Sequence, residues 1–112
     1  MKLVTAVLAP DKLDAIARAL AEREVFRMTA TECRGVIRND DGTPQLADKI
    51  RLEIAVNENF VKPTIEAIQS AGVEVDDGGS DAGENSGFGK IFVSELLDVV
   101  RIRTGERGPD AI

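Results

Sequence analysis

The chain has 112 residues with 14 Lys and Arg against 20 Asp and Glu, and its net charge of −6 argues against a nucleic-acid or anionic-membrane partner. It contains no His and one Cys, which excludes an internal disulfide and leaves zinc and copper without their usual ligands. We expect a single domain over residues 1–112, in the cytoplasm, with no segment inserted into a membrane.

The N-terminal third predicts a strand followed by an amphipathic helix. Leu3 to Leu8 is a short β-prone apolar run that stops before Pro10. After Pro10, apolar residues recur at helical spacing, while Arg18, Glu22 and Arg23 fall on the opposite, solvated face. The residues expected to point inward are Leu13, Ile16, Ala17, Leu20 and Ala21.

The middle of the chain predicts two strands that pair as a hairpin. Val25 to Arg38 is rich in Thr, Val and Ile and predicts a long strand, and a turn signal begins at Asn39. We expect a loop from Asn39 to Asp48. Beyond it, apolar and polar residues alternate from Ile50 to Val56, as in a strand with one covered face.

The last elements complete a ferredoxin-like βαββαβ fold of the α+β class. A helix is expected from about Phe60 to Ala71, with Val61, Ile65 and Ile68 inward and Pro63 in its first turn. An acidic, glycine-rich loop follows from Gly72 to Gly87, and a strand begins at Lys90. This order gives a four-stranded antiparallel sheet with both helices on one face, so self-association is expected to cover the other.

Two segments near the C-terminus carry the features of a polyphosphate site. Gly87-Phe88-Gly89-Lys90 places flexible backbone and a cation just before a strand, and Arg101 and Arg103 project to the same side if extended. Alone, such a glycine turn is more often an ordinary turn, and two arginines are more often a solvated face. Their joint occurrence in an acidic chain favours a nucleotide-phosphate site.

Several separated segments resemble the PII signalling family. The matching residues are Met1-Lys2-Leu3, Met28-Thr29, Thr31-Glu32, Arg34-Gly35, Gly89-Lys90-Ile91-Phe92-Val93 and Val100 to Glu106. The last tract is the most specific of these. The resemblance implies a homotrimer that binds ADP, AMP or ATP, the last with Mg²⁺, in the clefts between subunits.

The resemblance also implies a role for each matching position. Gly87, Gly89 and Lys90 would hold the phosphates, with Phe88 in the same turn where the family has an acidic residue, and Arg101 and Arg103 would reach in from the neighbouring subunit. The cleft would be lined by Thr29, Gly35, Val36, Ile37 and Arg38, with Val7 and Glu53 near the base and sugar. No catalytic residue and no protein-bound metal is implied.

Two departures from the family bear on the effector. The chain has no Tyr, which excludes control by tyrosine nucleotidylylation, and its loop between the second and third strands is short. Asn39 and Lys49 match only part of the family's 2-oxoglutarate site, so binding of that ligand stays open. The acidic loop before Gly87 is expected to disfavour a third phosphate, so that ADP or AMP binds at least as well as ATP.

The resulting hypothesis is a non-enzymatic sensor of energy and inorganic carbon. A short loop with an intact nucleotide site resembles the PII-like branch linked to bicarbonate transport and carboxysomes, so bicarbonate is expected near Lys49 or Arg38 and a bicarbonate transporter is the expected partner. The alternatives are a nitrogen-status regulator that responds to ATP and 2-oxoglutarate, a slow ATPase that uses Glu53 or Glu106, and a structural trimer.

Overall fold

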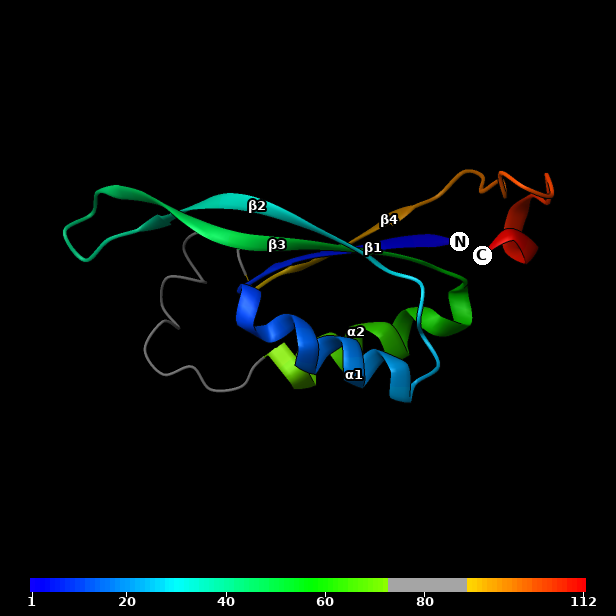
Figure 1. Cartoon of the computed structure of the whole chain (residues 1–112), viewed down its shortest axis with the longest axis horizontal. Coiled ribbons are helices and arrows are strands. Elements are labelled where there is room, and N and C mark those ends of the chain that lie inside the picture. The colour runs from blue at the N-terminus through cyan, green and yellow to red at the C-terminus, as the bar shows by residue number, and fades with distance from the viewer. Residues whose placement is uncertain (73–88) are drawn as a thin grey trace.

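The computed structural model describes residues 1–72 and 89–112 and confirms the ferredoxin-like βαββαβ order. The four strands form one antiparallel sheet in the order β2-β3-β1-β4. Both helices lie on the same face of this sheet (Figure 1). The elements are β1 Lys2–Leu8, α1 Leu13–Glu22, β2 Thr29–Arg38, β3 Pro44–Val56, α2 Glu58–Gly72 and β4 Ile91–Glu95, with 3₁₀ turns at Pro10–Lys12 and Gly108–Ala111.

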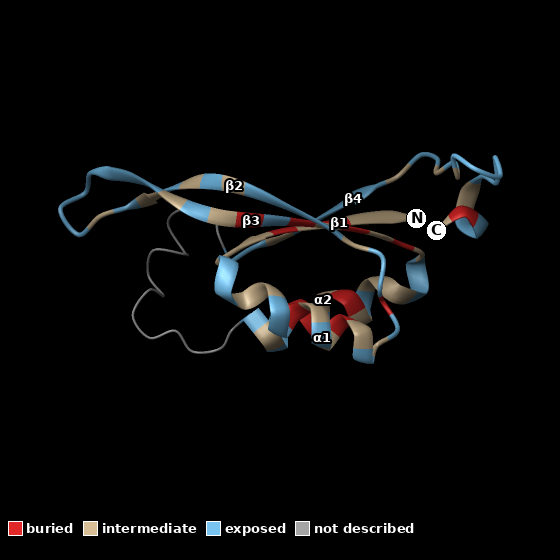
Figure 2. Cartoon of the chain, in the orientation of Figure 1, coloured by how far each residue is buried: buried red, intermediate tan, exposed pale blue. Residues whose placement is uncertain are grey.

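The core lies between the two central strands and the two helices. Val4 of β1 is opposite Ile54 of β3 and Val93 of β4, so alternate residues of these strands point toward the helices. This confirms the alternation predicted for residues 50–56. The buried core residues, red in Figure 2, include Val4, Ala6, Leu52, Ile54 and Val56 from the sheet and Ile16, Leu20, Ala67 and Ile68 from the helices.

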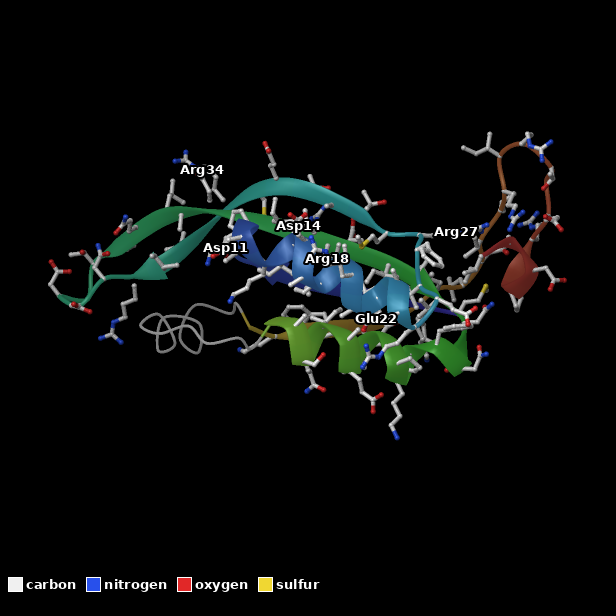
Figure 3. All side chains as sticks on the ribbon, turned by 60° about the horizontal axis from the view of Figure 1, so that its bottom comes forward. Asp11, Asp14, Arg18, Glu22, Arg27 and Arg34 are labelled. Carbon is white, nitrogen blue, oxygen red and sulfur yellow. The ribbon has the colours of Figure 1, made fainter. Side chains whose placement is uncertain are left out.

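The helical patterns predicted most of the inward residues and missed a few. Asp14, Arg18 and Glu22 follow one another along the outer face of α1 (Figure 3), as expected for its solvated side. In α2, Thr64 is fully buried although its hydroxyl has no hydrogen-bond partner. The helix begins at Glu58 rather than Phe60, because the N–H of Phe60 already bonds to the carbonyl of Asn57. Pro63 therefore lies inside the helix and not in its first turn.

The strand predicted from Val25 begins only at Thr29, because residues 23–25 close the end of α1. Glu24 has a positive φ of 61°, its N–H bonds to the carbonyl of Ala21, and the N–H of Val25 bonds to Leu20. This is the hydrogen-bond pattern of a Schellman cap. It also turns the Val25 side chain into the core, where it is 7% exposed.

The predicted loop from Asn39 to Asp48 is wrong, since only residues 39–43 are outside the strands. Strand β3 starts at Pro44, opposite Arg38, and the ladder runs without a break to Glu53 opposite Thr29. Proline is tolerated there because it is the first residue of the strand. The outer part of this hairpin, residues 34–48, projects beyond both helices in Figure 1, and we call it the arm.

The tip of the arm is closed by its own polar groups. The N–H of Asn39 bonds to the carbonyl of Thr43 at 2.8 Å, and Gly42 adopts a φ of +90° that favours glycine. Thr43 donates its hydroxyl and its backbone N–H to Asp41 at 2.6 and 2.9 Å. These two hydrogen bonds hold the pKa of Asp41 below its usual 3.8.

Within the described residues no helix is long and apolar enough to cross a membrane.

Candidate functional site

The glycine-lysine segment lies where the sequence predicted it, directly before the last strand. Gly89 has a φ of +82°, a conformation that favours glycine, and Lys90 precedes the first residue of β4. Ile91 is opposite Ala6 on the helix side, so continuing the register places Lys90 opposite Val7 on the other face, which we call the open face. Gly87 and Phe88 lie outside the described residues.

The open face also brings together the residues expected near a base and sugar. Thr29 on β2 is directly opposite Glu53 on β3. Val7 on β1 is opposite Arg51, which lies two residues before Glu53 on the same face of β3. A weak ion pair of 3.8 Å joins Arg51 to Glu53. Val7, Thr29 and Glu53 therefore share one face of the sheet, although they come from three different strands.

The four predicted residues at the end of β2 do not form a single surface. Gly35 and Ile37 belong to the open face, whereas Val36 and Arg38 belong to the helix side. Val36 is opposite Leu46, and both are about half exposed, at 53% and 51%. The strand conformation separates these side chains, so at most one alternate pair can line a cleft on a given face.

The two predicted arginines lie in a closed turn rather than an extended segment, which corrects the argument that they project to the same side. Residues 102–104 form the turn, closed by hydrogen bonds from Arg101 N–H to Glu106 and from Gly105 N–H to Arg101. The Arg101 side chain bonds to the carbonyl of Ala111 at 3.2 Å and lies 3.4 Å from a Glu106 carboxylate oxygen. Arg103 is exposed at the tip of this turn.

An ion pair between Arg107 and Asp98 lies at the base of the same turn. The Arg107 Nε donates to Asp98 at 3.0 Å, and this hydrogen bond lowers the pKa of Asp98 from its usual 3.8. Val100 and Arg107 form an isolated β-bridge. The turn that carries Arg103 is thus held in place by backbone and side-chain contacts.

A cavity of about 310 Å³ lies at the same end of the molecule. Arg27 and Ala55 both line it, each two residues beyond the Thr29–Glu53 pair toward the end of the sheet. Asn57 bonds to the carbonyl of Pro109 at 3.0 Å, while its Oδ1 is buried without a partner. The lining residues are Glu24, Val25, Phe26, Arg27, Ala55, Val56, Asn57, Phe60 and Ile112.

Sequence reasoning missed this cavity. Phe26 is 70% exposed beside it, and an aromatic residue directly after a helix cap is the signal that could have suggested a binding wall. The prediction instead placed residues 25–28 in a strand, where they would have alternated across the sheet.

A single chain does not bring Lys90 and the two arginines together. Lys90 precedes β4, whereas Arg101 and Arg103 follow it, and the five residues of β4 alone span about 17 Å. Figure 1 shows the C-terminal turn at the end of the sheet away from the arm, where the N-terminus also lies. The residues predicted to bind phosphate therefore lie beyond opposite ends of β4.

The two candidates for a second effector site are also far apart. Asn39 donates its side chain to the Thr43 hydroxyl at 3.0 Å at the arm's tip, whereas Lys49 is opposite Cys33 within the ladder. Asn39 is six residue steps along the chain from Cys33, which in a strand corresponds to roughly 20 Å. They could meet only if the ladder between them opened.

The two carboxylates considered as catalytic groups of a slow ATPase each form an ion pair with an arginine. Glu53 pairs with Arg51, and Glu106 pairs with Arg101. Among the described residues no group of three or more Asp, Glu, Cys or His side chains could hold a metal ion.

The sequence matches the model of the family described as "Nitrogen regulatory protein P-II" over residues 1–106. It is 42% identical to nitrogen regulatory protein GlnK1 of Methanosarcina mazei over 121 aligned positions, covering all of this chain and 97% of that protein. Nitrogen regulatory protein P-II of Azospirillum brasilense is 37% identical, with both chains fully covered. The corresponding protein of Nostoc punctiforme is 34% identical over the same span.

Proposed function

The chain belongs to the PII nitrogen regulatory protein family, and on that premise we propose that it is a nitrogen-status signal protein that binds an adenine nucleotide between neighbouring copies. PII proteins are homotrimers that regulate partner proteins, they bind adenine nucleotides, and they are signal transducers rather than enzymes. The names of the relatives favour nitrogen regulation over the bicarbonate and carboxysome function that we expected from the short loop.

The observation that carries this proposal is the division of the charged residues into two half-sites. The segment before β4 offers Gly89 and Lys90, and the closed turn beyond the other end of β4 offers Arg103. In a ring of copies, the first segment of one chain meets the turn of the next. A polyphosphate bound there would contact cations from both chains.

The cavity beside the arginine turn suits the other part of a nucleotide. Its volume of about 310 Å³ is at the lower limit of small-molecule sites, and Phe26 and Phe60 supply aromatic walls. The buried Oδ1 of Asn57 lacks a donor, which an amino group on a bound base would supply. Thr29 and Glu53 on the adjoining row would then contact the sugar.

We propose that ADP or ATP is read directly, without 2-oxoglutarate as a second ligand. The separation of Asn39 from Lys49 supports this, because the family's second site needs both positions together. With ATP, Mg²⁺ would be held mainly by phosphate oxygens and water, given the absence of an acidic cluster in the described residues. The partner is a regulated protein of the cytoplasm.

Calorimetric titration of ADP and ATP into the purified protein tests the proposal, repeated with 2-oxoglutarate and Mg²⁺ and with bicarbonate. We expect saturable binding of both nucleotides, no turnover of ATP, and affinities that neither addition changes. Absence of nucleotide binding would contradict the site. Affinity that rises only with bicarbonate would instead support carbon sensing, and a strong effect of 2-oxoglutarate would contradict the proposal that the nucleotide is read alone.

A further inference from the structure

Asn57 joins the start of α2 to the 3₁₀ turn Gly108–Ala111. Its Nδ2 donates to the carbonyl of Pro109 at 3.0 Å, although the two residues are 52 positions apart in the sequence. Figure 1 shows both segments at the end of the sheet that lies away from the arm. The side chain of Asn57 therefore ties this 3₁₀ turn to the helix layer.

The position of Asn57 makes this choice of partner unusual. Asn57 directly precedes α2, and its carbonyl accepts the N–H of Phe60 at 2.9 Å, as in a residue that begins a helix. An asparagine there ordinarily turns its side-chain oxygen to the N–H groups of the first helical turn. In the described part of the chain, the Oδ1 of Asn57 is instead buried and has no hydrogen-bond partner. The amide thus holds Pro109 and leaves α2 without this cap.

The 3₁₀ turn supports the arginine turn, which comprises residues 101–106. The Nε of Arg101 donates to the carbonyl of Ala111 at 3.2 Å, and Ala111 is itself only 6% exposed. The same Arg101 side chain forms an ion pair with Glu106, the residue whose carbonyl closes the arginine turn. Hydrogen bonds therefore lead from α2 through the 3₁₀ turn to the segment that presents Arg103.

We propose that Asn57 is a positioning residue of the nucleotide site, which fixes the 3₁₀ turn and, through it, the arginine turn. This inference rests on the proposed function, in which Arg103 contacts the phosphates. Asn57 also lines the cavity, where a donor on a bound base would meet its unpartnered Oδ1. A base bound there would hold the amide in the orientation that donates to Pro109, so an occupied cavity favours the ordered arginine turn.

An aspartate at position 57 separates the two hydrogen-bonding roles of the amide. Its carboxylate can cap α2 and can still accept from a base, but at neutral pH it has no donor for Pro109. Asn59→Asp is the matched control, because Asn59 is exposed in the first turn of α2 and its substitution adds the same charge. Thermal unfolding checks that both variants keep the fold.

Amide hydrogen exchange in the nucleotide-free protein measures the positioning. The reporters are Gly105 and Gly108, whose N–H groups bond to the carbonyls of Arg101 and Val99. Asn57→Asp should speed exchange at both glycines by about three- to tenfold, the loss expected for one neutral hydrogen bond. Asn59→Asp should exchange as the wild type does. Unchanged exchange at Gly105 in Asn57→Asp would overturn the proposal.

Calorimetry with ADP tests whether the ordered turn contributes to binding. Relative to Asn59→Asp, Asn57→Asp should weaken ADP binding by about three- to tenfold. This loss should largely disappear in an Arg103→Ala background, because the arginine through which Asn57 acts is then missing. Equal losses in the two backgrounds would mean that Asn57 acts on the base alone, and would overturn the positioning role. Wild-type affinity in Asn57→Asp would also overturn it.

Failure of the proposed function would look different. A wild type that binds no ADP would contradict the nucleotide site itself. The exchange comparison needs no nucleotide, so it would still decide whether Asn57 fixes the arginine turn.

Discussion

Lys90 and Arg101 lie at opposite ends of β4, Lys90 just before its first residue and Arg101 beyond its last. Pairing with β1 fixes the strand between them and holds the two residues apart within one chain. The proposed nucleotide site is therefore incomplete without a second copy.

Lys90→Ala and Arg103→Ala should each weaken ADP binding by about ten- to a hundredfold, the usual loss for one charged hydrogen bond of about 1.5 to 3 kcal/mol. Calorimetry measures the affinity, and light scattering should show an unchanged assembly. Lys62→Ala, an exposed lysine on α2, is the control. Wild-type affinity in Arg103→Ala would remove that residue from the site.

Ala55→Leu should lower nucleotide affinity by about tenfold or more, because the added side chain enters a cavity of only about 310 Å³. The same substitution at Ala15, exposed on α1, should leave affinity unchanged. Thermal unfolding of both variants checks that the fold is retained. Equal affinities in the two variants would place the base elsewhere.

Saturating 2-oxoglutarate should leave the backbone NMR resonances of Asn39 and Lys49 in place, with nucleotide and Mg²⁺ present. The reason is the ladder that holds the two residues roughly 20 Å apart. Loss of the ladder signals from residues 34–38 on adding the ligand would show that the arm opens, contrary to the proposal.

The order of elements and the inner face of the core could be predicted from the sequence because they depend on local periodicity. Ile16 and Leu20 recur at helical spacing, and Leu52 and Ile54 alternate as in a strand. The boundaries depend on hydrogen bonds that composition does not reveal. Val25 has strand propensity, yet the cap at the end of α1 turns it into the core.

The candidate site was predicted less completely, since it depends on turns and on distant segments. Arg101 and Arg103 stay predicted site residues, and spacing alone could not show that Gly105 and Glu106 close a turn around them. The cavity wall at Asn57 arises where the C-terminal turn meets the start of α2, a contact between residues far apart in sequence.

The Asp41 carboxyl group at the tip of the arm should titrate at acidic pH, below its usual pKa. The hydrogen bonds from Thr43 lower the folded-state pKa of Asp41, so their contribution to stability is complete above the ordinary value of 3.8 and is lost as pH falls through the lower folded value. The Thr43 amide chemical shift should report a midpoint below 3.8, and Asp41→Asn should abolish that transition. A midpoint at or above 3.8 would contradict these hydrogen bonds.

Complementation between two variants tests the shared site most directly. Lys90→Ala and Arg103→Ala chains, each with its own tag, are co-expressed, and assemblies carrying both tags are titrated with ADP. Each mixed trimer should regain one site of wild-type affinity, formed by Lys90 of an Arg103→Ala chain and Arg103 of a Lys90→Ala chain. If the mixed assemblies bind as weakly as either parent, the site lies within one chain and the central claim is wrong.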